Sequence, residues 1–508
     1  MMVAISRIGA AIACGVLIAA GSGCTGDSAE KGEPAPDAAS PVLENVPCPQ
    51  DVAKAVIGDV SCGYVTLPER PLGRDNDRTV RIFVARVSPP GGAPSAEPVV
   101  VAGTSFGSVP NYLGIAPLAQ RTGREVVIVD PRGVGHSEPS LDCDQVHAAA
   151  GDAMEAGTGR QLVEAVRNCH AVVSESGLDP AAFASTAMAH DLDGVRRALG
   201  IEKWAVAAFG SSALIVAELM RLHPDQVTAV ILDSPLLPGM EPLGGAQERL
   251  TGVVRSLLTV CRQDPSCSRR YGEPGLTLEA ALDTVTAEPI VLRPHNPDGE
   301  VVRLVLDREL LLRALRQITS DGGSSGVTMT LEAVPSILRQ VVDRDTFRLT
   351  RGLGQALLAQ EPFCLGRSTS CLAPRHHISV GAWLTTMCGD LAPFAHRATP
   401  RERQLTGVDL CSAWPVDETD SGTSTAVRWD QPTLVAVGRW STYTPPGAVR
   451  AATRLLEDVT WVIDPAGGNN VLPRTRCALE VRDSWLQDAA HAVDTGCMQR
   501  ERLRWVDG

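Results

Sequence analysis

The sequence predicts an α/β fold, in which an open, mostly parallel sheet is covered by helices and carries a large, mainly helical insertion. Short apolar runs such as VVVA and VVIV suit strands that are buried on both faces, and they alternate with helical segments. That alternation breaks between about residues 240 and 428, where helical Leu/Ala/Arg patterning dominates. A chain of 508 residues with 44% hydrophobic residues can bury such a core, so wholesale disorder is excluded.

The strands and helices follow one another in the order that a parallel sheet requires. Residues 188–199 and 213–222 have helical patterning between apolar runs. The expected strands are residues 79–87, 98–102, 125–130, 204–209, 229–233, 433–437 and 459–463. We therefore expect core residues 47–239 and 429–508 to form one sheet domain, with residues 240–428 inserted as a cap over the strand ends.

The N-terminal segment has the features of a bacterial export signal. Arg7 is followed by the apolar residues 8–20, and small residues lead to Cys24. We expect residues 1–23 to be a lipoprotein signal peptide and Cys24 to be lipidated, which would anchor the protein extracytoplasmically to the cell membrane. A released, secreted protein is the alternative. Residues 24–46 are polar and rich in Ala and Pro, so they are expected to be a disordered tether.

Twelve cysteines remain outside Cys14 and Cys24, and an even number in an exported chain favours disulfides. Neighbouring cysteines give six expected pairs: Cys48–Cys62, Cys143–Cys169, Cys261–Cys267, Cys364–Cys371, Cys388–Cys411 and Cys477–Cys497. None has the C-x-x-C spacing of a zinc site, and His376–His377 lack nearby ligands. No metal and no cofactor are expected.

The charge balance argues against a nucleic-acid partner. The formal net charge is −13, and no run of Lys or Arg could form the basic surface that phosphates need. The partners that we expect are the membrane lipid and a peptide or small molecule held under the cap.

Three segments carry a family resemblance: VVIVDPRGVGHSEPSLDC at 126–143, DLDGVRRALG at 191–200 and RLHPDQVTAVILDSP at 221–235. With the tail PTLVAVGRWSTYTPP at 432–446, they resemble the secreted and lipoprotein tripeptidyl-aminopeptidase-like serine exopeptidases, which are related to proline iminopeptidases. The resemblance covers nearly the whole mature chain. It implies the alpha/beta-hydrolase fold with a helical cap insertion and a serine, histidine and carboxylate at three framed positions.

At each of these three positions the expected residue is missing. Counting from His223-Pro224, the nucleophile position of the G-x-S-x-G elbow falls on Gly210. The acid position of the G-x-x-D-x-x-T-P pattern is Ser441, and the base position is Asn469. An amide cannot accept a proton near neutral pH, and a hydroxyl cannot hold a compensating charge. The chain therefore looks like a triad-deficient homologue.

Four other residues are candidates for a rearranged site. Ser105 lies in a second G-x-S-x-G, where the family keeps its oxyanion loop, and Pro110 interrupts the turn that follows. Ser211 and Ser212 come one and two places after the nucleophile position, where an elbow would point them elsewhere. His491 is the only histidine after Asn469.

Two functions from different classes follow. The first is a catalytically inactive, membrane-anchored binding or scaffolding protein that keeps the pocket under its cap. The second is an active serine exopeptidase or esterase with rearranged catalytic groups. They differ in whether any serine, histidine and carboxylate converge within hydrogen-bond reach.

Overall fold

The computed structural model describes residues 41–506 apart from 57, 72–76, 93, 95, 104–116, 148, 150–159, 296–298, 322–328, 360–378, 394–397, 401–402, 404–407 and 417–424. The signal segment, Cys24 and most of the tether lie outside the described residues. So do Ser105, the Cys364–Cys371 pair and His376–His377.

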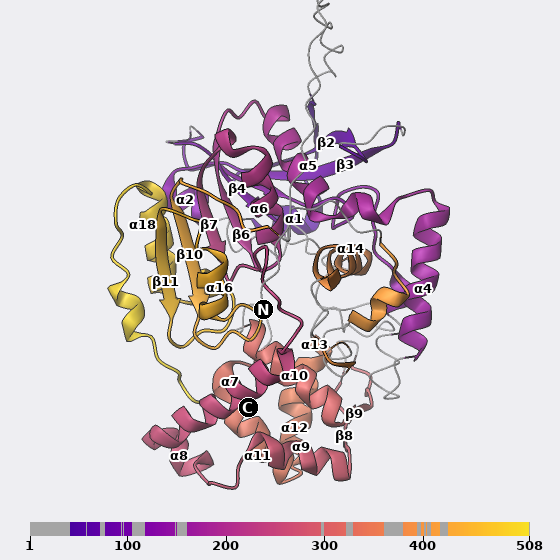
Figure 1. Cartoon of the computed structure of the whole chain (residues 1–508), viewed down its shortest axis with the longest axis vertical. Helices are drawn as coiled ribbons and strands as arrows, with labels where there is room; N and C mark the ends of the chain where they lie inside the picture. Colours follow the sequence, from indigo (N-terminus) through magenta and orange to yellow (C-terminus); the bar gives the residue numbers. More distant parts are fainter. Residues whose placement is uncertain are drawn as a thin grey trace, which may run out of the picture. The chain divides into compact units, whose positions relative to one another are not determined.

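A nine-stranded sheet forms the centre of the fold (Figure 1). Its order is β1-β2-β3-β5-β4-β6-β7-β10-β11. The strands are β1 (Leu43–Val46), β2 (Val60–Pro68), β3 (Thr79–Val87), β4 (Val99–Ala102), β5 (Val126–Val129), β6 (Trp204–Phe209), β7 (Val227–Asp233), β10 (Thr433–Gly438) and β11 (Val459–Asp464). From β5 to β11 all neighbours are parallel, whereas β1, β2 and β3 join antiparallel. The expected mostly parallel sheet is confirmed.

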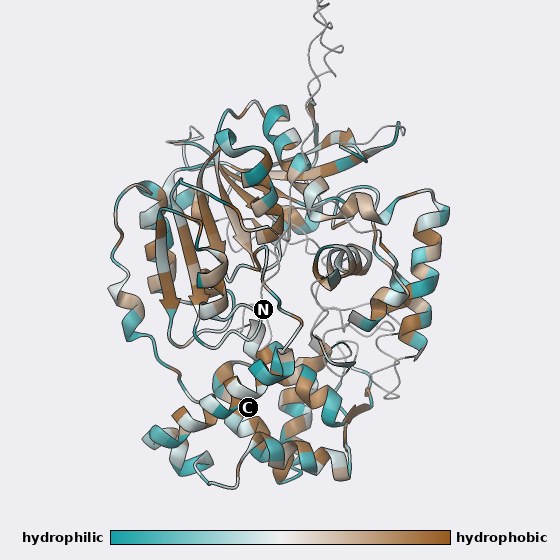
Figure 2. Cartoon of the chain, viewed as in Figure 1, coloured by the Kyte–Doolittle hydropathy of each residue, from teal (hydrophilic) through white to brown (hydrophobic). Residues whose placement is uncertain are grey.

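The sheet is buried on both faces, and alternate residues of each strand face opposite helix layers. One hydrophobic cluster joins α5 (Ser185–Ala198), α6 (Ser212–Leu222) and α16 (Pro446–Ala452) to the sheet. On the other face lie α1 (Gln50–Ala55), α2 (Pro117–Thr122) and α18 (Arg476–Gln487). Figure 2 shows the hydrophobic colour along the central strands.

One boundary differs from the sequence-based expectation. Leu43–Val46, expected as the end of the tether, forms β1, which pairs antiparallel with β2. Its backbone gains a ladder partner, so this short polar segment is ordered by pairing rather than by its own apolar content.

The insertion between β7 and β10 packs in two parts. Its first part has its own hydrophobic cluster, which also includes Trp440 from the loop after β10. The elements of this part are α7 (Ala246–Gln263), α8 (Pro265–Tyr271), α9 (Leu278–Ala287), β8 (Ile290–Leu292), β9 (Leu304–Leu306), α10 (Arg308–Asp321), α11 (Val334–Val342), α12 (Thr346–Leu349) and α13 (Gln355–Ala359). We call this part the cap.

The second part, with α14 (Val380–Thr385), packs instead on the main core cluster, as Trp414 does. Two further helices are α4 (Arg160–Glu175) in the core and α17 (Val471–Arg474) after β11. Among the described residues, no helix combines the length and apolar character needed to cross a bilayer.

Five of the six expected cysteine pairs are joined as disulfides. They are Cys48–Cys62, Cys143–Cys169, Cys261–Cys267, Cys388–Cys411 and Cys477–Cys497. Each closes a short loop between neighbouring elements, as the spacing indicated.

Candidate functional site

Three loops meet around the end of β7, at Asp233 and Ser234. The carbonyl of Asp233 accepts a hydrogen bond from the Gly210 amide at 3.0 Å, which ties the end of β6 to this point. The Ser234 amide donates to the carbonyl of Ala436 in β10 at 2.7 Å, and the Asn470 amide donates to Ser234 Oγ at 3.0 Å. The turn at Gly210, strand β10 and the turn that carries Asn469 are therefore joined through two neighbouring residues.

Gly210 stands between β6 and α6 with φ +53°, a left-handed conformation that favours glycine. A Cβ built at this position would have none of the described residues within 4 Å, apart from its two chain neighbours. Ser212 stabilises the turn through two hydrogen bonds to the backbone of Phe209. Its Oγ accepts from the Phe209 amide at 2.8 Å and donates to the Phe209 carbonyl at 2.9 Å. The turn keeps an elbow-like backbone, with a glycine at the position where the elbow serine is expected.

Ser441 and Asn469 lie in direct contact across the loops after β10 and β11. Ser441 Oγ accepts the Thr444 amide at 2.9 Å, and its own proton is donated to Asn469 Oδ1 at 2.5 Å. Thr444 Oγ1 lies 3.4 Å from the same Oδ1. With Oδ1 engaged by the hydroxyl, the amide group of Asn469 presents its Nδ2–H₂ donors on the other side.

The close approach of these two loops depends on Gly438. A Cβ at this position would lie 1.7 Å from the carbonyl oxygen of Gly468, so no other residue fits without moving the backbone. The Trp440 amide and indole bond the carbonyls of Gly467 and Pro465, each at 3.0 Å. These contacts hold Ser441 in the register that lets it reach Asn469.

Asp233 has no solvent exposure, and burial raises the pKa of its carboxyl to about 6. Its oxygens accept hydrogen bonds from the amides of Val471 at 2.9 Å and Leu472 at 2.8 Å, which act in the opposite direction. Ser234 Oγ donates to the same carboxyl at 2.9 Å. Asp233 thus positions the start of α17 and, through it, the turn that carries Asn469.

This arrangement of strands, turn and cap agrees with the family comparisons. Residues 97–255 match the model of the alpha/beta hydrolase fold, and residues 399–497 match the model of the TAP-like proteins. The chain belongs to the alpha/beta hydrolases. The second match spans both Ser441 and Asn469, and the first spans Gly210.

Other comparisons add little to this assignment. Curated protein sequences give no match. Solved alpha/beta hydrolases include a proline iminopeptidase from Mycobacterium smegmatis, which is 17% identical with a TM-score of 0.37 and covers 84% of this chain and 98% of its own. A probable hydrolytic enzyme from Pseudomonas aeruginosa PAO1 is 12% identical with a TM-score of 0.39 and covers 89% of this chain and 99% of its own. At these values the neighbours have no bearing on the chemistry of the site.

The three described candidates, Ser211, Ser212 and His491, do not form a triad with one another. Ser212 is buried, and its hydroxyl is engaged by Phe209. Ser211 is the N-cap residue of α6, with a right-handed helical backbone conformation, and directly follows Gly210. His491 is 80% exposed and pairs with Asp488 at 2.7 Å, which raises the pKa of the imidazole. In the described part of the chain, nothing links this histidine to Gly210.

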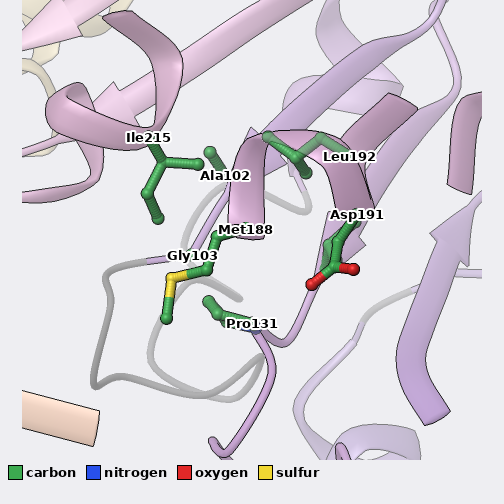
Figure 3. Close-up of a pocket in the computed structure, with 8 residues that line it drawn as sticks. Ala102, Gly103, Pro131, Met188, Asp191, Leu192 and Ile215 are labelled. Atoms are coloured by element: carbon green, nitrogen blue, oxygen red, sulfur yellow. The ribbon is translucent and has the colours of Figure 1, made fainter. Parts of the chain in front are cut away.

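A small cavity opens at the ends of β4 and β5, beside the expected oxyanion loop (Figure 3). Met188, Leu192 and Ile215 line it from α5 and α6. Its charged residue, Asp191, is already paired with Arg132 Nη2 at 2.6 Å, so the cavity offers apolar contact rather than a polar anchor. Among the described residues, no group of three or more His, Cys, Asp or Glu side chains is placed to hold a metal ion.

One residue that positions the site, Asp233, was not expected from the sequence. It ends a buried apolar strand, and a carboxylate at that place was the signal that could have identified it.

Proposed function

We propose that the protein is a non-hydrolytic alpha/beta hydrolase that binds a ligand between its core and its cap, and acts as a membrane-anchored, extracytoplasmic binding or scaffolding protein. The observation that carries this proposal is the hydrogen bond from Ser441 to Asn469, next to a turn where Gly210 offers no side chain. All three positions have lost the group that hydrolysis requires.

The proposal follows from the direction of the hydrogen bonds. Serine hydrolysis needs a base that accepts the proton of the nucleophile, and a carboxylate that stabilises the resulting cation. Here the Oδ1 of Asn469 already accepts from Ser441, and its Nδ2 can only donate. The site therefore differs from a triad in its hydrogen-bonding groups. Asn469 offers N–H donors to a ligand at the position where the histidine of a hydrolase offers an acceptor nitrogen.

The first expected result concerns reactivity. A fluorophosphonate probe should leave the purified protein unlabelled, and aminoacyl- and tripeptidyl-arylamides should not be turned over. An active serine hydrolase of the same fold serves as the positive control. Labelling at Ser105, Ser211 or Ser212, lost when that serine is changed to alanine, would support the active alternative and overturn the proposal.

The triple variant Gly210→Ser, Ser441→Asp and Asn469→His is the companion to this experiment. It should fold yet show little turnover, because Ala208 and Ser212 replace the glycines of the elbow. Oxyanion donors are also needed, each worth about 3 to 4 kcal/mol. Turnover in this variant alone would support the three residue assignments while showing that the elbow tolerates the changes.

Anchoring outside the cytoplasm is part of the same proposal. Five disulfides suit an oxidising compartment, and Cys24 follows a segment with the features of a lipoprotein signal. In the native host, Cys24→Ala should move the protein out of the membrane fraction. Cys14→Ala, within the same leader, is the matched control and should leave it there. Unchanged membrane partition of the Cys24 variant would contradict lipidation at this residue.

A further inference from the structure

Arg313, in α10 of the cap, forms no ion pair with any of the described residues. Its side chain is only partly exposed, and its Nε is sealed from solvent with no hydrogen-bond partner. In the described part of the chain it forms no ion pair or other hydrogen bond. Leaving such a donor unpaired is strongly unfavourable, so its position calls for an explanation.

The helix that carries Arg313 meets the loop that carries Ser441. Arg316 Nη1 donates to the hydroxyl of Tyr443 at 2.9 Å, and Thr319 Oγ1 lies 3.3 Å from Thr442 Oγ1. Arg313 precedes Arg316 by three residues, which places both on one face of α10. Burial lowers the pKa of Arg313, and the positive charge of Arg316 acts in the same direction. Both guanidinium groups therefore lie close together where the cap meets the core.

Two other cap arginines are already bound to the loop after β10. Arg249 Nε donates to the carbonyl of Thr442 at 3.0 Å, and Arg316 is bound by Tyr443. Two acids act on Arg313 from a distance, but Asp307 is used to cap the helix through the Leu310 amide at 2.8 Å, and Glu309 forms no ion pair with it. Among the described residues, no carboxylate therefore forms an ion pair with Arg313.

We propose that Arg313 binds the carboxylate of a ligand held between the cap and the core, and that the terminal carboxylate of a peptide fits this role. A guanidinium group presents parallel N–H donors that match the two oxygens of a carboxylate. A singly charged group suits the site better than a doubly charged phosphate, because Asp307 and Glu309 already lie within electrostatic range. This inference rests on the proposed function, since it names the ligand class of a site that binds without cleaving.

Calorimetric titration of the purified protein tests the assignment. The probes are an N-acetylated tripeptide with a free carboxylate, the same tripeptide as its C-terminal amide, and phenyl phosphate. The free carboxylate should bind best, and Arg313→Met should weaken it at least about tenfold while leaving the weak binding of the amide unchanged. Arg255→Met, which removes a 63% exposed cap arginine paired with Glu279, is the matched control and should leave affinity unchanged.

A second measurement guards against a variant that merely misfolds. Without ligand, Arg313→Met should raise the melting temperature, because the variant no longer buries an unpaired charge. Equal affinity for the free carboxylate in the wild type and Arg313→Met, no preference of the wild type for carboxylate over amide, or tighter binding of phenyl phosphate would each overturn the assignment. The fluorophosphonate experiment distinguishes failure of this inference from failure of the proposed function. Labelling of the protein would refute the proposed function. If the protein is not labelled and also shows no preference for the free carboxylate, only the role of Arg313 is refuted.

Discussion

Replacing Asp191 by alanine should lower the free energy of unfolding by about 3 to 5 kcal/mol, because it strands a buried cation. Arg132 has no solvent exposure, and its Nε and Nη2 bond the two oxygens of Asp191 at 2.7 and 2.6 Å. Its Nη1 donates to the carbonyls of Glu69 and Ala182. These contacts join the turn after β5 to α5 and to the end of β2, so their loss should destabilise the packing of all three elements. Chemical denaturation measures the change.

The control for this result is Glu480→Ala, which removes a surface partner of Arg476. Both side chains are well exposed, at 61% and 91%, so the loss should stay below about 1 kcal/mol. The double variant Arg132→Met and Asp191→Leu should be more stable than Asp191→Ala, since no charge is then left unpaired. If Asp191→Ala lowers the free energy of unfolding no more than Glu480→Ala does, the Arg132–Asp191 pair is not essential to the stability of the core.

Stability should also fall as the pH rises from about 4 to 6, through the ionisation of Asp233. The folded protein holds the carboxyl pKa at about 6, above its usual 3.8, so it binds the proton more tightly than the unfolded chain does. Protonation therefore stabilises the fold below pH 4, and this contribution is lost as pH rises through 6. A shift of about two pKa units corresponds to about 3 kcal/mol.

Asp233→Asn isolates this effect because an amide does not titrate. The variant loses one acceptor for the Leu472 amide, which lowers its free energy of unfolding by the same amount at every pH. The difference in free energy of unfolding between variant and wild type should, in addition, change by about 3 kcal/mol between pH 4 and 7. Urea denaturation across this range measures the difference. Asp225→Asn, an exposed change just before the same strand, should run parallel to the wild type. Parallel curves for Asp233→Asn as well would contradict the raised pKa.

Most of the sheet could be predicted from local sequence, because its central strands are continuous apolar runs. β3 and β6 begin and end at the expected residues, and β10 differs by one. β1 and β2 were missed, because a strand with one solvated face is specified by its partner as much as by its own residues. Local reasoning therefore works best where both faces are buried.

The site was less predictable for a related reason. Gly210, Ser441 and Asn469 could be located by counting from flanking motifs, but the hydrogen bond between the last two depends on how two loops meet. The role of Asp233 depends on amides more than 230 residues further along the chain. Whether Arg313 Nε finds a hydrogen-bond partner depends on the residues that pack around it in the fold, and a local sequence pattern does not contain this information.

The disulfides described above also determine which parts of the molecule can separate. Cys261–Cys267 lies wholly within the cap, and none of the other four pairs joins the cap to the sheet domain. In the described residues, the two are connected covalently only where the chain itself passes between them. Their remaining ties include the hydrogen bonds of Arg249, Arg316 and Thr319 to the loop after β10. Separation of the cap from the sheet domain along this boundary would therefore break none of the described disulfides.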